Sequence, residues 1–462
     1  MKSTNSLTRT ERRAAESLAG IFGLRMFGLF LLYPVFAGYA HSFPGATALT
    51  IGVALGIYGL TQALLQLPFG MLSDHIGRKP VITLGLAIFV IGSVMAALSH
   101  TIGGIIAGRA VQGAGAVGAA TLALAADLTR AEHRTKAIAM IGSGIGLAFA
   151  VAVVAGPAIN AAAGLEGIFG ITAVLGACGL VVLWLAVPTP VRSLRHRSNQ
   201  AVPALLGQVL KDRELQRLYA SIFALHLMLA ALFMVLPAML GRVAGLAKSS
   251  EWLFYLPVLT VGLVLMVPAV IYAERQGKIK PVALGAIAVL ALTPLWLGLG
   301  GTHRVWLAFI LAVFFGAFTL MEALLPSLIS RLARPESKGS ALGVYSTSQF
   351  LGIFAGGVLG GLLLGRVGET GVFALIGVAG LAWLAFFATL KPPRMLASRM
   401  FTVDASNSQQ ARRLAQDLEA VAGVEEAVIL AEEGVAVVRV DAARLDEAAL
   451  ARILPDSTSE AV

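Results

Sequence analysis

Long apolar runs are the feature that most limits how this chain can fold. A helix of about 20 mostly apolar residues crosses the roughly 30 Å hydrocarbon core of a bilayer, because its backbone polar groups are satisfied within the segment. Twelve such segments are predicted at 14–40, 48–72, 80–99, 102–126, 137–160, 167–187, 218–240, 252–273, 281–300, 305–329, 340–365 and 371–390. We therefore expect an all-α membrane protein with twelve transmembrane helices.

The composition excludes most soluble folds. Of the 462 residues, 57% are hydrophobic and 13% are charged, whereas soluble domains carry about 25% charged residues. The first span follows Glu11-Arg12-Arg13 without a small-residue cleavage site, so we expect it to be retained rather than removed as a signal peptide. The single cysteine, Cys178, excludes a disulfide within the chain and a thiolate metal cluster.

The positive charges predict the orientation in the membrane. The formal net charge is +10, and the basic residues gather in alternate loops, beginning with the N-terminal segment. By the positive-inside rule, both termini are expected in the cytoplasm. A nucleic-acid partner is not expected, because no basic patch with interleaved aromatic residues lies outside these short loops. The loops of the other set hold only Arg242, Lys248, Arg304 and Arg366.

An internal repeat divides the spans into two sets of six. Asp74 and Gly77 follow the second span, and Glu274, Gly277 and Lys278 follow the eighth, 200 residues later. Transporters are commonly built from such repeated halves. The predicted organisation is an N-terminal half (1–187), a cytoplasmic linker (188–217), a C-terminal half (218–394) and a soluble tail (395–462).

The loop after the second span carries a resemblance to a known family. It contains Gly70, Asp74, Gly77, Arg78 and Lys79, and in this position the pattern resembles the loop signature of the major facilitator superfamily. The resemblance covers essentially the whole chain. It implies two six-helix halves that open alternately to the two sides of a bacterial inner membrane.

Two further motifs resemble those of proton antiporters in the same family. Arg109 and Gln112 occupy the motif in span four, and Gly156-Pro157 form the Gly-Pro core of the motif in span five. Asn160-Ala161 depart from the pattern, because a glycine is expected there. The resemblance therefore implies proton-driven efflux, with this one departure against it.

Four ionisable residues lie within predicted spans: Arg25, Arg109, His226 and Glu322. A charge at the centre of a lone helix costs about 2.5 to 3.5 kcal/mol on insertion scales, so such a residue usually faces a cavity or a partner. We expect all four at the central cavity. The alternative for the two arginines is a structural role, with the guanidinium bonded to backbone carbonyls.

Glu322 and His226 are the predicted proton-coupling residues. Desolvation disfavours a carboxylate, so a carboxyl in a low-dielectric cavity can exchange a proton near neutral pH. Pro326 cannot donate to the carbonyl of Glu322, which leaves a free acceptor beside the carboxyl. His226 is the expected partner or second titrating group, and the alternative is a buried, hydrogen-bonded histidine.

Polar stripes at helical spacing are predicted to line the cavity where the halves meet. They consist of Tyr58, Gln62 and Gln66 in span two and of Tyr345 and Gln349 in span eleven. The alternative is hydrogen bonding between helices, worth about 0.6 kcal/mol for each bond. Rows of small residues, including Gly352 and Gly356, are expected to let helices approach closely, as is Gly156-Pro157.

The signature loop is predicted to form a cytoplasmic gate. Asp74 can face the positive amino terminus of span eleven near Ser340, and Arg78 can pair with Asp127 at the end of span four. Glu274, Gly277 and Lys278 are the expected counterpart in the second half. The alternative is that these charges act only as solvated topology determinants.

The tail has the composition of a small soluble domain. Residues 399–405, 426–432 and 435–441 alternate like strands, the last two as a hairpin around Glu433-Gly434, and 408–422 and 444–454 are predicted helices. The order βαββα resembles a ferredoxin-like module. No Cys-x-x-Cys is present, which excludes thiol-based metal transfer. Regulation, ligand sensing and self-association remain alternative roles.

These observations predict a secondary transporter and not an enzyme. No phosphate loop, nucleophile elbow or metal-ligand cluster occurs, so no catalytic residue, metal or cofactor is predicted beyond the proton gradient. The expected partners are a small amphipathic solute and the lipid bilayer. Proton-linked uptake, facilitated diffusion and a membrane sensor acting through the tail are the alternatives to efflux.

Overall fold

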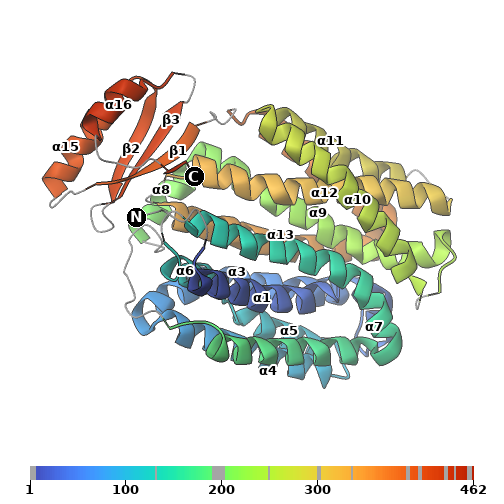
Figure 1. Cartoon of the computed structure of the whole chain (residues 1–462). Helices are drawn as coiled ribbons and strands as arrows, with labels where there is room; N and C mark the ends of the chain where they lie inside the picture. Colours follow the sequence, from blue (N-terminus) through green and yellow to red (C-terminus); the bar gives the residue numbers. More distant parts are fainter. Residues whose placement is uncertain are drawn as a thin grey trace.

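A computed structural model gives the three-dimensional arrangement of the chain. It describes residues 7–130, 133–189, 203–247, 250–298, 303–334, 337–391, 396–403, 408–430, 435–441, 444–454 and 460–461. Two sets of long helices lie side by side, and the tail lies at one end of them, beside α8 (Figure 1). We call this the tail end and the opposite end the far end. Residues 190–202 of the predicted linker and the turn Glu433-Gly434 lie outside the described residues.

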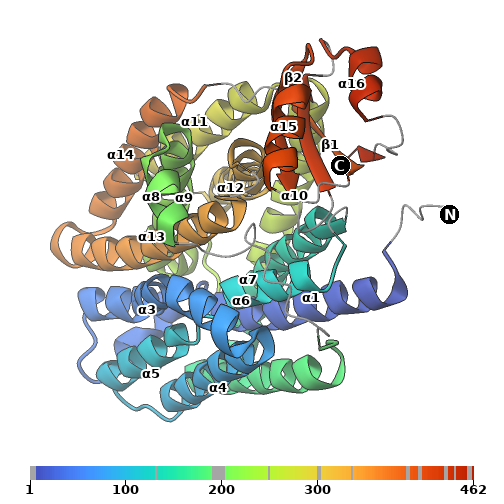
Figure 2. The same ribbon diagram turned by 90° about the vertical axis from the view of Figure 1, so that its left-hand side faces the viewer.

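The first set of helices is formed by the N-terminal part of the chain. Its elements are α1 (Arg9–Phe30), α2 (Phe36–Tyr39), the 3-10 turn η1 (Ala40–Ser42), α3 (Ala48–Ile76), α4 (Arg78–Ala97), α5 (Ile102–Ala114), α6 (Gly118–Asp127) and α7 (Arg134–Leu185). Seen along the bundle from the tail end, these helices occupy one side of the molecule (Figure 2).

The second set follows the linker. Its elements are α8 (Pro203–Lys211), α9 (Arg213–Val243), α10 (Trp252–Arg275), α11 (Ile279–Gly298), α12 (Arg304–Leu332), α13 (Lys338–Val367) and α14 (Glu369–Ala388). Helices α3 and α13 pack along each other and join the two sets.

Ten helices in the described part are long and apolar enough to cross a membrane. This number is smaller than the twelve predicted, for two physical reasons. Helix α7 is continuous by hydrogen bonding over two predicted spans, although Gly164 breaks it with non-helical torsion angles. Helix α1 ends at Phe30, inside the first predicted span, and the chain continues through turns into α2.

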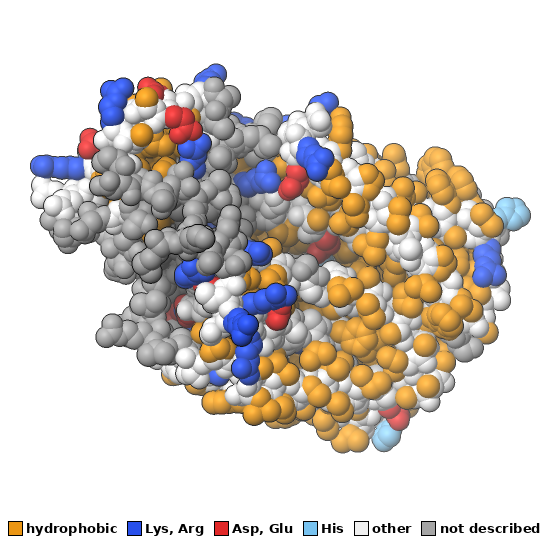
Figure 3. All heavy atoms as spheres, in the orientation of Figure 1, with side chains coloured by type: hydrophobic (Ala, Val, Ile, Leu, Met, Phe, Trp, Pro, Cys, Tyr) orange, Lys and Arg blue, Asp and Glu red, His pale blue; other side chains and the backbone are white. Residues whose placement is uncertain are grey.

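The outer surface of the bundle is apolar, as a lipid-facing surface must be. Large hydrophobic side chains such as Leu64, Trp184 and Val264 are exposed, and hydrophobic atoms cover the bundle away from the tail (Figure 3). Charged side chains gather toward the tail end in the same view. An exposed apolar band of this extent indicates a membrane-embedded surface rather than a soluble one.

The tail is a small α/β unit. Strands β1 (Leu396–Thr402), β2 (Val424–Leu430), β3 (Val435–Asp441) and β4 (Glu460–Ala461) form a sheet in the order β2-β3-β1-β4, with all described pairs antiparallel. Helices α15 (Ser408–Glu419) and α16 (Glu447–Ile453) complete it. Leu418 is fully buried against the sheet, as the helical pattern predicts. The two-residue β4 is absent from the prediction, because so short a strand has no detectable pattern.

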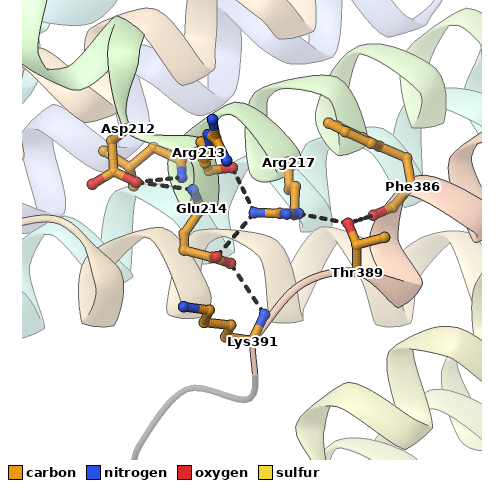
Figure 4. Close-up of polar contacts among 8 residues, drawn as sticks. Asp212, Arg213, Glu214, Arg217, Phe386, Thr389 and Lys391 are labelled. Carbon is orange, nitrogen blue, oxygen red and sulfur yellow. Dashed lines mark hydrogen bonds and ion pairs between the residues drawn. The ribbon is translucent and has the colours of Figure 1, made fainter.

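A polar junction joins the start of α9 to the chain that leads into the tail (Figure 4). The carboxylate of Glu214 accepts a hydrogen bond from the backbone amide of Lys391 at 3.1 Å and one from Arg217 at 2.9 Å. Arg217 also donates to the hydroxyl of Thr389 at 2.7 Å. The exit from α14 is therefore held to the second set of helices.

Candidate functional site

The predicted proton-coupling residues meet in the core of the second half. Helix α9 carries His226, α12 carries Glu322 and α13 carries Gln349. Nε2 of His226 lies 3.5 Å from Oε1 of Glu322 and 2.8 Å from Nε2 of Gln349. Sequence analysis placed Gln349 only on a polar stripe, whereas the structure brings it into contact with His226.

The hydrogen bonds indicate which nitrogen carries the hydrogen when the imidazole is neutral. Nδ1 of His226 lies 3.2 Å from the carbonyl oxygen of Ile222, which can only accept, so Nδ1 carries the hydrogen. Nε2 is then an acceptor for the amide of Gln349. A proton that moves to Nε2 makes the ring cationic and turns its contact with Glu322 into an ion pair.

Glu322 differs from His226 in its access to the surroundings. The side chain of His226 is 3% exposed, whereas that of Glu322 is 29% exposed. The Oε1 atom of Glu322 is nevertheless buried and has no hydrogen-bond partner among the described residues. One oxygen therefore faces the protein and needs a donor, while part of the side chain is exposed.

An aromatic cluster covers the far-end side of this pair. It consists of Phe30, Tyr33, Phe149, Phe233, Phe315 and Phe318, and its rings contact one another across the two halves at centroid distances between 5.1 and 6.4 Å. Phe318 also contacts His226 at 5.9 Å. On α9 and α12 the cluster residues lie toward the far end from His226 and Glu322. The cluster therefore lies between this pair and the far end.

Tyr345, on α13, adds a further polar group near Glu322. Tyr345 interacts electrostatically with Glu322, and its buried hydroxyl has no hydrogen-bond partner among the described residues. A solute or a water molecule at this point would meet both the hydroxyl and the carboxyl.

The two intramembrane arginines lie in the first half, and both are buried. Arg109 donates to the backbone carbonyls of Ala54 at 3.2 Å and Leu55 at 3.1 Å and to the side chain of Gln112 at 2.8 Å. Gln112 in turn donates to Ser93. These bonds hold α3, α4 and α5 together. Such a structural role is the alternative to a cavity role for Arg109.

Arg25 is held by the polar stripe of α3. Its Nη2 donates to Oε1 of Gln62 at 2.5 Å, and Gln62 donates to Gln66 at 2.8 Å. The ring of Tyr58 lies between the two arginines, 5.8 Å from the guanidinium carbon of Arg25 and 5.1 Å from that of Arg109. The polar side chains of α3 therefore contact the two arginines.

The predicted ion pair of the gate motif is present. Nε of Arg78 lies 3.1 Å from Oδ2 of Asp127, and the two side chains are 5% and 1% exposed. Arg78 also pairs with Asp74 and donates to Ser73. Gly77 has a φ of 98°, a backbone conformation that favours glycine, and begins the tight turn into α4.

Other members of the motif have structural partners. Nζ of Lys79 donates to the carbonyl of Val187 at 2.6 Å, which ties α4 to the end of α7. Gly70 approaches Ala119 closely enough that a Cβ would lie 3.1 Å from the Ala119 methyl carbon. The predicted approach of Asp74 to the start of α13 stays a prediction, although Ser340 is buried there.

The counterpart of the gate motif in the second half also forms an ion pair, with the acid in the repeated loop and the base on another helix. Glu274 at the end of α10 pairs with Arg331 at the end of α12, with 3.1 Å between Nη2 and Oε1. Lys278 donates to the hydroxyl of Tyr272 at 3.1 Å. Gly277 has a φ of 64°, like Gly77 in sign. Arg331 as the partner of Glu274 was not predicted.

The glycines that were predicted to pack helices do so. A Cβ on Gly352 or Gly356 would overlap the backbone of α9 at Phe223 or Leu227. A Cβ on Gly156 would lie 2.5 Å from the carbonyl oxygen of Leu31 and 2.9 Å from the ring of Pro34. Pro157 is accommodated within α7 beside this contact.

An ion pair at the tail end, between the buried Glu11 and the exposed Arg130, was not predicted. Glu11 accepts hydrogen bonds from the backbone amide and Nε of Arg130, both at 2.9 Å, and caps α1 through Thr8. Burial raises the pKa of Glu11, but the bonds from Arg130 and Thr8 outweigh it and lower the pKa to about 2. The motif Thr8 to Glu11 has the spacing of a capping box, which could have identified Glu11.

The described residues contain no group of three potential metal ligands. The candidate site consists of Glu322, His226 and Gln349 in one half and of the two arginines and Tyr58 in the other.

Comparisons with known proteins agree with this architecture. A sequence model of the Major Facilitator Superfamily matches residues 18–292 and 248–414. The "Inner membrane transport protein YajR" of Escherichia coli K12 is 41% identical over 94% of this chain and 95% of its own length. The "Multidrug resistance protein MdtH" of Aeromonas hydrophila is 25% identical over 76% of this chain and 92% of its own.

Two solved structures share the fold. The human organic anion transporter MFSD10 superposes with a TM-score of 0.61 and 20% identity, and the nucleoside transporter NupG with 0.62 and 15%. Each match covers 82% of this chain and all of the other. At these identities the likeness concerns the fold alone.

Proposed function

The chain belongs to the major facilitator superfamily, and on that basis we propose that it exports a small amphipathic solute in exchange for protons. The proposal includes twelve transmembrane spans, with α1 to α2 as the first and α7 as two spans that meet at Gly164. Both termini are placed in the cytoplasm, so the tail end is the cytoplasmic end. The tail, with two helices and an antiparallel sheet, is proposed to be ferredoxin-like.

The contact between Glu322 and His226 is the observation that carries the proposal. A carboxyl beside an imidazole at 3.5 Å, inside an apolar helix bundle, can hold a proton in two places. Glu322 is the group that solvent and solute can reach, so it is the proposed site of exchange. His226, fixed by Ile222 and Gln349, stabilises the carboxylate when the proton has left.

The aromatic cluster supports alternating access. It packs across the two halves on the far-end side of Glu322, and we propose that the carboxyl is reached from the tail end in this conformation. A rocking motion of the halves would break the cross-half contacts of Phe149 with Phe315 and Phe318 and expose the carboxyl to the other side. A proton taken up there and released at the tail end would drive solute outward.

The direct test uses inverted membrane vesicles with an acid interior and a dye that reports the pH gradient. Amphipathic compounds are added one by one, and an exported compound is expected to release protons from vesicles that contain the wild-type protein. Glu322→Gln should abolish this release, because an amide cannot exchange a proton. Glu166→Gln is the matched control, since Glu166 is exposed at the break in α7.

Two results would contradict the proposal. Proton release that persists in a folded Glu322→Gln variant would exclude Glu322 as the coupling residue. Solute transport by wild-type protein that continues without a pH gradient and releases no protons would exclude antiport and favour facilitated diffusion.

A further inference from the structure

The first half contains a cluster of hydrogen-bond donors without an acidic partner. The ring of Tyr58 lies 5.8 Å from the guanidinium carbon of Arg25 and 5.1 Å from that of Arg109, and Tyr33 lies near Tyr58 and Arg109; we call these four residues the donor cluster. All four side chains are buried, at 0 to 1% exposure. No ion pair in the described part of the chain joins either arginine to a carboxylate. Two positive charges are thus enclosed in an apolar bundle without a counter-charge.

The two arginines differ in how their donors are used. Arg109 is bonded through Nε, Nη1 and Nη2 to carbonyl oxygens and to Gln112. Arg25 has only the bond to Gln62, and its Nε and Nη1 are buried without a hydrogen-bond partner. The hydroxyls of Tyr33 and Tyr58 are also buried and unpartnered. The free donors of the cluster therefore come from Arg25 and from the two tyrosines.

Enclosing such groups is costly unless something compensates them. A buried polar group without a partner costs about 1 to 3 kcal/mol, and a buried charge costs more. The free Nε–H and Nη1–H of Arg25 point in different directions, so each can donate one charge-assisted hydrogen bond to a separate acceptor atom. The cluster offers these two donors together with the hydroxyls of Tyr33 and Tyr58, and such a set of donors suits an anionic acceptor.

The donor cluster lies at the junction of the two halves. The ring of Tyr33 contacts Phe233 on α9 at 5.4 Å, and the ring of Tyr58 contacts Phe350 on α13 at 6.1 Å. Both contacts join the first half to the second. The residues that cover the cluster on this side would therefore move away from it when the halves rock apart.

We propose that the donor cluster is an anion site on the transport path, with Arg25 as its principal ligand. It would bind a compact monoanionic group, either the carboxylate of a transported solute or a free halide. The inference rests on the proposed function, because it places the site between halves that alternate. If the ligand is the carboxylate of a transported solute, the inference restricts the exported solutes to compounds that carry an anionic group.

The test measures thermal unfolding of the full-length protein, purified in detergent, at constant ionic strength. Sodium isethionate, an organic sulfonate that is neither a carboxylate nor a halide, is the reference salt, and chloride and benzoate are the two probes. At an anion concentration about a hundredfold above Kd, the unfolding midpoint of the wild type should rise by about 3 °C. Benzoate alone raising the midpoint would indicate a solute carboxylate, and chloride alone a free halide.

Three variants test the assignment to Arg25. Arg25→Gln should abolish the shift, and Tyr58→Phe, which keeps the ring and removes only the hydroxyl, should weaken apparent anion affinity by about tenfold. Arg334→Gln removes the same charge from an exposed position and should behave like the wild type. If Arg25→Gln fails to fold, Tyr58→Phe still provides the comparison.

The inference is wrong if the wild-type midpoint is the same in all three salts, or if folded Arg25→Gln responds like the wild type. Glu322→Gln separates this failure from failure of the proposed function. It should keep the anion-dependent shift while it loses proton release. An anion shift that is absent in every protein, with proton release still dependent on Glu322, would overturn the anion site alone.

Discussion

Replacing Gly56 by alanine should shift the protein toward a conformation that is open at the far end. Gly56 on α3 packs against α13, and a Cβ at this position would lie 2.9 Å from both the Cα and the carbonyl oxygen of Phe354. An ordinary contact needs about 3.4 Å or more, so the two helices must separate by about half an ångström. Both atoms are backbone atoms, so no side-chain rotation relieves the overlap.

The cost falls on the conformation in which α3 and α13 are in contact. Overpacking of this kind typically costs about 1 to 3 kcal/mol. Since about 1.4 kcal/mol corresponds to a tenfold change in an equilibrium, the far-end-open population should rise by a factor of roughly 5 to 150. Gly142 is the matched control, because no atom would lie within 4 Å of its Cβ. Gly142→Ala should leave the populations unchanged.

Spin-label distances between the halves provide the measurement. His100 and His303 are exposed residues at the far end, one in each half, and each can be replaced by a labelled cysteine. Cys178 is exposed and free, so it is first changed to serine. Gly56→Ala should increase the long-distance component of the distribution. An unchanged distribution in a folded variant would show that the α3–α13 contact persists in both conformations, and the reasoning would be refuted.

Two further predictions concern the tail end. Asp127→Asn removes the more deeply buried of the two carboxylates that pair with Arg78 and leaves Asp74, so it should lower the free energy of unfolding by about 1 to 3 kcal/mol, measured by thermal unfolding against wild type; an unchanged midpoint would contradict the assignment. Because the folded pKa of Glu11 is about 2, its interaction with Arg130 stabilises the fold above about pH 4.5 and is lost as pH falls toward 2. Glu11→Gln should therefore unfold at a lower temperature than wild type at pH 6, and the difference should shrink at pH 3.5; a constant difference would contradict the assignment.

Much of the helical arrangement could be predicted because it depends on local pattern. An apolar run of sufficient length has few alternatives to a membrane helix, and the starts of α3, α10 and α12 fall within a residue of the predicted spans. The pairing of Arg78 with Asp127 was also predictable, because a buried guanidinium at a helix start needs a nearby carboxylate. These features require no knowledge of how the halves pack.

Other features depend on tertiary contacts that a linear pattern does not contain. The fourth predicted span is interrupted between α5 and α6, where Gly115 packs against the backbone of Gly85. The aromatic cluster was invisible because phenylalanine is ordinary in any apolar span, and only the crossing of helices brings Phe149 to Phe315. The contact of Gln349 with His226 likewise joins residues 123 positions apart.

Each half has an ion pair that joins two of its helices near the tail end. Arg78 and Asp127 link α4 to α6 in the first half, whereas Glu274 and Arg331 link α10 to α12 in the second. Glu274 lies 200 residues after Asp74 and Arg331 lies 204 residues after Asp127, so the second half has a base where the first half has an acid, and this base pairs with the acid of the repeated loop.

The exposed fractions of these two ion pairs predict which half rearranges more easily during transport. The first pair is 5% and 1% exposed, and breaking such a buried pair is strongly destabilising. The second is 35% and 46% exposed, and exposed pairs contribute about 0 to 1 kcal/mol. The tail end of the second half is therefore the less costly one to rearrange. Since Glu214 holds the exit of α14 to this same half, a movement of α9 there would be transmitted to the tail.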